Sequence, residues 1–161
     1  ETAAAAAAVG LAAGMDLADV ASGLATATMS PLRMSIVPLA SGAVVLDDSY
    51  NANPTSMRAA LDALGALPAT KRVAVLGVMA ELGPESDDEH AAIAEEAARR
   101  GIEVIAVGAP QYRAESQGGR SVADVDEALD ALGDVGAGTA VLAKGSRVAG
   151  LDELVRRLQG T

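Results

Sequence analysis

The stretch AVVLDDSYNANPTSMRAALDAL, residues 43–64, passes from an apolar run through a polar cluster into a helical pattern. The apolar run predicts a buried strand, and apolar residues recur at helical spacing after the cluster. Asn53 suits the N-cap of that helix, and Pro54 suits its first position because proline has no N–H to leave unpaired. The stretch therefore predicts a strand followed directly by a helix over residues 54–67.

The same strand-to-helix rhythm continues toward the C-terminus. Strands are predicted at 72–77, 102–107 and 139–143, helices at 86–100, 124–132 and 147–158, and a weaker stretch at 111–123. The strands are continuous apolar runs, as a sheet covered on both faces requires. This alternation favours an α/β fold with a doubly wound, mostly parallel sheet and right-handed crossovers. Ligands bind such sheets beyond the carboxyl ends of the strands.

A β-hairpin is predicted before the first crossover. Residues 34–39 and 43–48 read as two strands with a connection of hairpin length between them. The preceding stretch TATMSPLR, residues 26–33, reads as a linker because its Ser30-Pro31 step disfavours helix.

The first thirty residues predict a pair of short helices, at 2–13 and 17–24, with Asp16 as the N-cap of the second. The pair is too small to bury its own apolar face. We therefore interpret residues 1–30 as the helical tail of a preceding domain and residues 31–161 as a domain of their own.

The composition narrows the class of function. A formal net charge of -10 argues against a nucleic-acid binder and against docking on an anionic membrane. No apolar run reaches the ~20 residues of a membrane span. Without cysteine there is no disulfide framework and no cysteine zinc site, and we expect a reducing, cytoplasmic location. Because the chain opens at Glu1 and not at Met, we expect a fragment or a processed product.

Helix initiation does not explain every polar residue of the opening stretch. Asp47 and Asp48 are adjacent carboxylates, which repel each other unless a cation or hydrogen-bond donors satisfy them. Tyr50 and Asn51 place a phenol and an amide beside a helix N-terminus, where they suit a ribose or a purine edge. The end of this strand is therefore a candidate nucleotide site.

A second candidate site follows the last predicted strand. Lys144, Ser146 and Arg147 lie between that strand and a helix N-terminus, in a strongly acidic chain. Backbone N–H groups and two cations at such a place form an anion site. The glycines at 136 and 138 do not make a P-loop, because an apolar strand separates them from Lys144.

The loop after the strand at 72–77 is bounded by glycines and carries Met79, Glu81 and Leu82. Apolar residues at the ligand-facing edge suggest contact with a partner domain or with substrate.

Helix initiation and packing explain the residues beyond this loop. Ser86 and Glu89 have the spacing of a capping box, which predicts the start of the helix at 86. His90 is the one histidine of the chain, and the chain has no cysteine or second histidine that could bind a metal together with it. We interpret it as a packed or solvated residue and not as a metal ligand.

Three segments together resemble the C-terminal domain of the Mur ligases over roughly residues 31–158. They are, in this order and at this spacing, LDDSYNANPTSMRAALDAL, VAVLGVMAELG…SDDEH and VLAKGSR. DDSYNANP and KGSR resemble the branch that joins D-alanyl-D-alanine to UDP-N-acetylmuramoyl-tripeptide in peptidoglycan precursor synthesis. The resemblance implies a Rossmann-like domain of an ATP-dependent ligase. Such a domain closes onto the enzyme's own central domain, which carries the P-loop and the Mg²⁺ ligands.

By motif, the resemblance assigns two sets of residues. The residues that would line the nucleotide side are Asp48, Tyr50, Asn51 and Asn53. The residues that would hold the dipeptide carboxylate or the developing phosphate charge are Lys144, Ser146 and Arg147. It assigns no catalytic residue and no metal ligand to this chain, so we expect the chain to fold but not to turn over. The family commonly has Asp after Gly77, whereas this chain has Val78, so the role of that acid does not carry over.

Other hypotheses remain open. A signalling receiver domain also places paired acids at an early strand end, but its phospho-accepting Asp is replaced here by Gly77 and Val78. A stand-alone nucleotide-binding or scaffolding module without catalysis is the second alternative. A folylpolyglutamate-type or other amino-acid-adding ligase is a third, against which DDSYNANP and KGSR speak.

Overall fold

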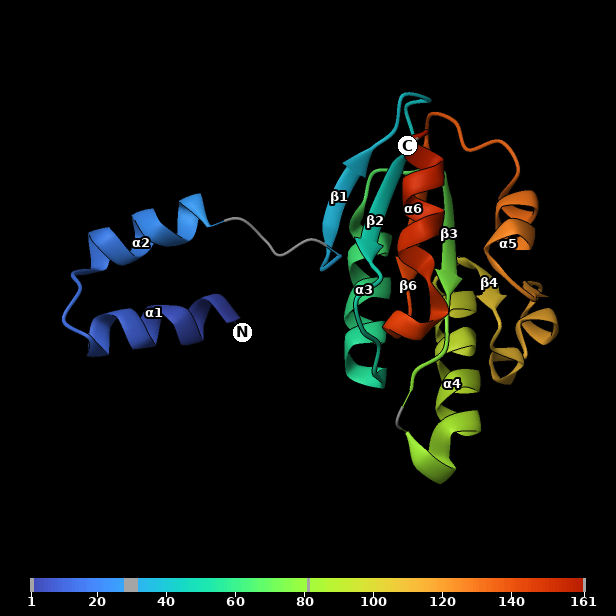
Figure 1. The fold of residues 1–161 in the computed structure, drawn as a ribbon, viewed down its shortest axis with the longest axis horizontal. Coiled ribbons are helices and arrows are strands. Elements are labelled where there is room, and N and C mark those ends of the chain that lie inside the picture. Colours follow the sequence, from blue (N-terminus) through green and yellow to red (C-terminus); the bar gives the residue numbers. More distant parts are fainter. Residues whose placement is uncertain (1, 28–31, 81, 161) are drawn as a thin grey trace. The chain divides into compact units, whose positions relative to one another are not determined.

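The computed structural model describes residues 2–27, 32–80 and 82–160 and divides into two compact units, residues 1–30 and 31–161 (Figure 1). The first unit holds helices α1 (Thr2–Ala12) and α2 (Leu17–Thr26). Asp16 caps α2 as predicted, since its carboxylate accepts from the Asp19 N–H at 2.8 Å. The core of the predicted linker, residues 28–31, lies outside the described residues.

The second unit is built on a six-stranded sheet of order β1-β2-β6-β3-β4-β5 (Figure 1). Among the strand pairs that the structure describes, only β1–β2 is antiparallel, which confirms both the hairpin and the mostly parallel sheet. The last strand, β6, pairs with β2 on one side and with β3 on the other. The strands are β1 (Ser35–Pro38), β2 (Val44–Asp48), β3 (Lys71–Leu76), β4 (Glu103–Val107), β5 (Arg120–Val122) and β6 (Thr139–Lys144).

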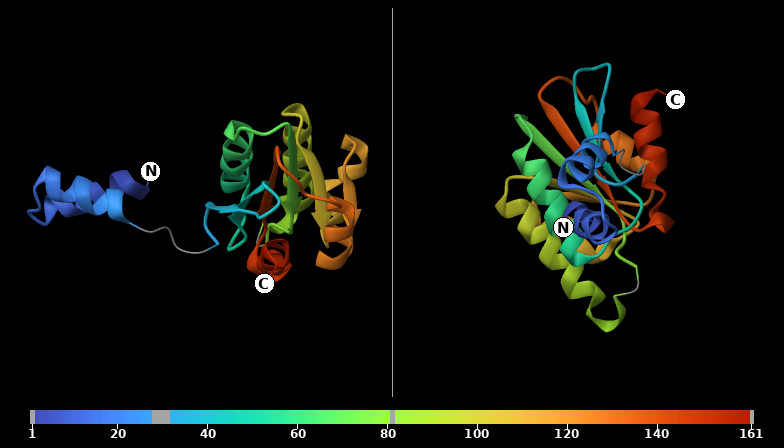
Figure 2. Two further views of the ribbon diagram at one scale, coloured as in Figure 1. Left: turned by 90° about the horizontal axis from the view of Figure 1, so that it is seen from above. Right: turned by 90° about the vertical axis from the view of Figure 1, so that its left-hand side faces the viewer.

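Helices cover both faces of this sheet, as the apolar strands predict (Figure 2). Successive residues of a strand point to opposite faces. In β3, Ala74 and Leu76 belong to one core, and Val73 and Val75 belong to the other. The first core packs against α3 (Pro54–Ala66) and α4 (Ser86–Arg99), the second against α5 (Val125–Leu132) and α6 (Leu151–Gln159).

The start of α3 agrees with the prediction and adds to it. Asn53 is the N-cap, and its side chain accepts from the Ser56 N–H at 2.8 Å. The Ser56 hydroxyl in turn accepts from the Asn53 N–H at 3.1 Å. Pro54 occupies the first turn. The two residues cap each other reciprocally, with serine in the place where glutamate or glutamine is usual.

The capping box predicted at the start of α4 is wrong. Ser86 lies inside the helix, and the N-cap Glu85 makes no side-chain cap hydrogen bond. A 3₁₀ turn over Gly83–Glu85 leads directly into α4, so the chain never adopts the extended conformation in which a cap residue works.

The weaker stretch at 111–123 contains structure that the sequence pattern does not reveal. It holds the 3₁₀ turn Ala114–Gln117 and the edge strand β5, which pairs in parallel with β4. Its three residues, Arg120, Ser121 and Val122, are exposed or only partly buried and give no apolar run, so periodicity cannot detect this strand. Across the described part of the chain, no helix has the length and apolarity to cross a membrane.

Candidate functional site

The carboxyl ends of three neighbouring strands lie at one level of the sheet. In the register of the parallel pairs, Lys144 is opposite both Asp48 of β2 and Leu76 of β3. The chain leaves β3 toward the face covered by α4 and leaves β6 toward the face covered by α6. Loops that diverge from adjacent parallel strands open the crevice where ligands bind in such sheets.

Lys144 is almost completely buried at this level, with 1% of its surface exposed. Its Nζ lies 2.5 Å from Asp48 Oδ2 and donates to the Asn51 carbonyl at 2.8 Å. The ammonium thus joins the end of β6 to the loop after β2. Its charge is directed to Asp48, so direct contact of Lys144 with a substrate anion stays a prediction.

The two adjacent carboxylates are satisfied by different donors, as expected for neighbouring acids. Asp47 Oδ1 accepts from the Ser49 hydroxyl at 2.6 Å and from the Ser49 N–H at 3.2 Å. Asp48 Oδ1 accepts from the Met34 N–H at 3.1 Å, while its second oxygen faces Lys144. Both acids therefore fix the local backbone.

Tyr50 is the exposed aromatic ring of the site, at 42% exposure. The guanidinium carbon of Arg33 lies 4.2 Å from the ring centroid, and that of Arg147 lies 5.8 Å from it. Both are within cation–π range. The sequence pattern did not single out Arg33, although a basic residue before the hairpin of an acidic chain is a signal in its own right.

A cavity of about 260 Å³ opens at this edge. Four residues predicted for the site line it together, which brings the loop after β2 to the loop after β6. Its lining is Tyr50, Asn51, Ala80, Ser146, Arg147 and Val148. Of the other predicted residues, Asp48 and Lys144 hold the adjoining backbone, and Asn53 caps α3.

Residues 77–80, here called the β3 loop, form the third wall. The Gly77 N–H donates to the Lys144 carbonyl at 2.9 Å, and Ser146 binds the loop twice. Its N–H donates to the Val78 carbonyl at 2.8 Å, and its Oγ accepts from the Ala80 N–H at 2.9 Å. Ser146 is buried and joins the two loops.

The approach of the two loops depends on glycine. A Cβ on Gly77 would lie 2.3 Å from the Ala149 Cβ, and a Cβ on Gly145 would lie 2.9 Å from the Gly77 Cα. Real side chains do not pack so closely, so glycine at both positions allows the ends of β3 and β6 to meet.

The contact predicted for the side chains of this segment is wrong for Met79. Met79 is buried in the core beneath α3 and α4, because the β3 loop turns it inward. Leu82 is partly buried against the same core. Glu81 lies outside the described residues.

Two buried side chains hold the β3 loop from below. His90 Nε2 accepts from the Met79 N–H at 2.9 Å, and Nδ1 lies 2.6 Å from the Ser86 carbonyl. The Tyr112 hydroxyl donates to the Gly77 carbonyl at 2.9 Å, and burial raises the pKa of that phenol. His90 is thus packed, in agreement with its interpretation. Among the described residues, no three His, Asp or Glu side chains gather to hold a metal.

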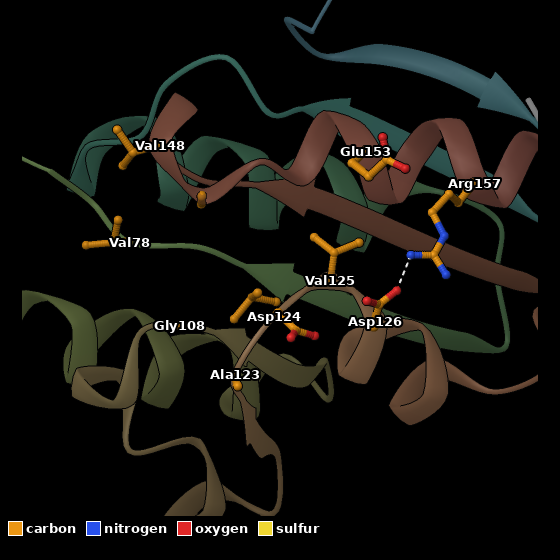
Figure 3. A pocket seen from close by; sticks show the side chains of 11 residues that line it. Val78, Gly108, Ala123, Asp124, Val125, Asp126, Val148, Glu153 and Arg157 are labelled. Carbon is orange, nitrogen blue, oxygen red and sulfur yellow. Dashed lines mark hydrogen bonds and ion pairs between the residues drawn. The ribbon is translucent and has the colours of Figure 1, made fainter.

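A larger cavity of about 560 Å³ lies along the carboxyl ends of β3 and β4 (Figure 3). Asp124, Asp126 and Glu153 give it an acidic lining, and Arg157 pairs with Asp126. That hydrogen bond raises the pKa of the Arg157 guanidinium. Its lining residues run from Val78 to Arg157, and such scattered positions form no motif that a sequence pattern shows.

Comparison with known proteins agrees with this arrangement. The profile of the family described as "Mur ligase, glutamate ligase domain" matches residues 32–147. The chain is 39% identical over 161 residues to the UDP-N-acetylmuramoyl-tripeptide–D-alanyl-D-alanine ligase of Escherichia coli (strain K12), covering 96% of this chain and 35% of that enzyme. The chain thus spans about a third of the length of this relative.

Solved structures give the same result. The crystal structure of MurF from Acinetobacter baumannii superposes with a TM-score of 0.84 at 32% identity, covering 99% of this chain and 36% of that one. The MurF ligase from Thermotoga maritima in complex with ADP gives a TM-score of 0.79 at 26% identity, covering 95% and 36%. The resemblance predicted from the sequence motifs is confirmed, and the chain belongs to the Mur ligase family.

Proposed function

We propose that this chain is the part of a UDP-N-acetylmuramoyl-tripeptide–D-alanyl-D-alanine ligase that closes onto the enzyme's central, ATP-binding domain. The cavity of about 260 Å³ carries the proposal, because residues of the first and last motifs line it together. The names of the Escherichia coli relative and of the ADP-bound Thermotoga maritima structure support it.

The loop after β2 forms the nucleotide side. Tyr50 offers an exposed ring for stacking on a base, and the Asn51 amide offers donors and acceptors for a purine edge or a ribose. Asp48 sets the position of this loop through Lys144, and Asn53 ends it as the helix cap. The cations near Tyr50 give a positive potential for phosphate groups in an otherwise acidic chain.

The loop after β6 forms the dipeptide side. The Ser146 hydroxyl accepts from Ala80 and keeps its own hydrogen to donate. The Arg147 guanidinium has the fork geometry that binds a carboxylate through two parallel hydrogen bonds. Lys144 fixes the base of the site through Asp48 and the Asn51 carbonyl.

In the proposed reaction, the terminal carboxylate of the UDP-linked tripeptide attacks the γ-phosphate of ATP, and ADP leaves. The amine of D-alanyl-D-alanine then attacks the acyl carbon, phosphate leaves and the nitrogen loses a proton. This chain would hold nucleotide and dipeptide in reacting geometry and exclude the water that hydrolyses an acyl phosphate.

We assign the P-loop and the Mg²⁺ ligands to the central domain, as the resemblance of the motifs to the Mur ligases implies. The reaction draws on ATP and a UDP-linked precursor, which accords with the cytoplasmic location expected from a chain without cysteine.

The deciding experiment measures phosphate release from ATP by the full-length protein with UDP-N-acetylmuramoyl-tripeptide, in the presence and absence of D-alanyl-D-alanine. We expect release that depends on the dipeptide, and no release by the 161-residue chain alone. Absence of release by the folded full-length protein with every substrate present would overturn the proposal and favour the nucleotide-binding module.

A further inference from the structure

We propose that His90 is a positioning residue: its neutral ring holds the β3 loop in the shape that completes the ligand cavity. The proposal deepens the proposed function and rests on it for its kinetic consequence. Its structural part rests on contacts of the chain alone.

The ring of His90 is completely buried, and both of its nitrogens are engaged. Nδ1 lies 2.6 Å from a carbonyl oxygen, that of Ser86, so this nitrogen carries the hydrogen and donates it. Nε2 lies 2.9 Å from the Met79 nitrogen, which is a donor, so this nitrogen carries no hydrogen and accepts. The two backbone partners therefore select one neutral tautomer.

The ring is also fixed by its packing. The Tyr112 ring meets it edge to face, with centroids 4.7 Å apart and planes at 77°. The Tyr112 hydroxyl donates a hydrogen bond to the Gly77 carbonyl. One histidine and one tyrosine thus hold two successive parts of the β3 loop from the α4 side.

The opposite side of the loop faces the site. Ala80 donates to Ser146 Oγ and lines the smaller cavity, while Val78 accepts from the Ser146 N–H and lines the larger one. Met79 lies between Val78 and Ala80, and its N–H donates a hydrogen bond to His90 Nε2. Release of this N–H would therefore loosen a wall shared by both cavities.

Binding at a loosened wall must first order the loop, which weakens the affinity for the ligand that touches it. In the full-length enzyme, we expect His90→Phe to raise the KM for D-alanyl-D-alanine about tenfold, the loss expected for an orphaned buried donor. The KM for the UDP-linked tripeptide should not change. His90→Gln, which keeps an acceptor near Met79, should restore part of the loss.

A matched control separates positioning from stability. Leu64→Ala removes a completely buried side chain of α3 and none of the hydrogen bonds that hold the β3 loop. It should lower the amount of folded enzyme and change no KM. If His90→Phe behaves in the same way, with maximal rate reduced and every KM unchanged, the proposal is overturned.

Two measurements on the 161-residue chain judge the geometry without any substrate. Because His90 is the single histidine, ¹⁵N-histidine labelling reports one ring, and a one-bond proton coupling should appear on Nδ1 and not on Nε2. Hydrogen exchange of the Met79 amide should accelerate about tenfold in His90→Phe relative to the sheet amides. The opposite tautomer, or unchanged relative exchange, refutes the positioning role. An inactive wild-type enzyme with both signatures present would instead refute the proposed function.

Discussion

Lys144 shows, at the scale of one residue, that a side chain predicted to bind a ligand can instead be paired with another residue of the protein. The side chain is 1% exposed and the Asp48 side chain is 13% exposed, so little solvent screens the pair. Removing one member of such a pair leaves a buried charge without compensation. The lysine therefore supports the site through the protein's own stability before any ligand arrives.

Replacing Lys144 with methionine should lower the free energy of unfolding by roughly 3–5 kcal/mol, because the Asp48 carboxylate loses its counterion. Urea denaturation followed by circular dichroism measures the change. Lys71→Met, at an exposed position of β3, should change stability by less than about 0.5 kcal/mol. Equal midpoints for the two variants would contradict the importance of the buried pair.

Asn53 separates helix capping from nucleotide binding. Asn53→Ser keeps an N-cap oxygen, so stability should be nearly unchanged, whereas Asn53→Ala should cost about 0.5–2 kcal/mol. If the side-chain amide also contacts the nucleotide, Asn53→Ser should raise the KM for ATP in the full-length enzyme. A normal KM in a stable Asn53→Ser variant would restrict this residue to capping.

Arg147 should behave in the opposite way to Lys144. It is exposed, so Arg147→Ala should change stability by no more than about 0.5 kcal/mol. Loss of a charge-assisted contact should lower kcat/KM for D-alanyl-D-alanine about tenfold or more in the full-length enzyme. Arg99→Ala, at the exposed end of α4, is the matched control and should leave kcat/KM unchanged.

At the scale of elements, the contact between the ends of β3 and β6 is set by glycine. Gly77→Ala should cost about 1–3 kcal/mol, because its Cβ would force the two loops apart. Gly65→Ala, near the end of α3 and with no atom within 4 Å of the added Cβ, should gain up to about 1 kcal/mol. Thermal unfolding of both variants gives the comparison, and a shift of the same sign would contradict it.

Most elements could be predicted from the sequence, because long apolar strands and capped helices are local signals. Strand β2 and helix α3 follow from one continuous stretch, and α2 begins at its predicted cap. Strand β5 could not be predicted, because its three residues depend on pairing with β4. The same limit applies to the start of α4, where the preceding 3₁₀ turn decides the geometry.

The candidate site could be predicted only as a set of residue types. Tyr50, Asn51, Ser146 and Arg147 do meet at one cavity, because parallel strands bring their loops to one edge. The pairing of Lys144 with Asp48 spans 96 positions of the chain, and no local pattern contains it. The inward turn of Met79 likewise depends on His90, which lies on another element.

At the scale of the whole molecule, both apolar cores lie inside the unit formed by residues 31–161. A variant without residues 1–30 should therefore keep one cooperative unfolding transition with a nearly unchanged urea midpoint. Far-ultraviolet circular dichroism can follow this transition. The near-ultraviolet signal of the buried Tyr112 can follow it as well, because the chain has no tryptophan to mask that signal. Loss of the transition would show that the domain depends on the helical pair.

The central place of β6 also bears on how the chain is made. Because β6 is the partner of both β2 and β3, the earlier strands form two separate pieces until residues 139–144 arrive. On the ribosome, these pieces leave the exit tunnel with unpaired edges, which are the edges that attract foreign strands. Folding of this sheet is therefore delayed until residues 139–144 have left the tunnel, and a message cut short before β6 yields a polypeptide that becomes a substrate for chaperones or proteases.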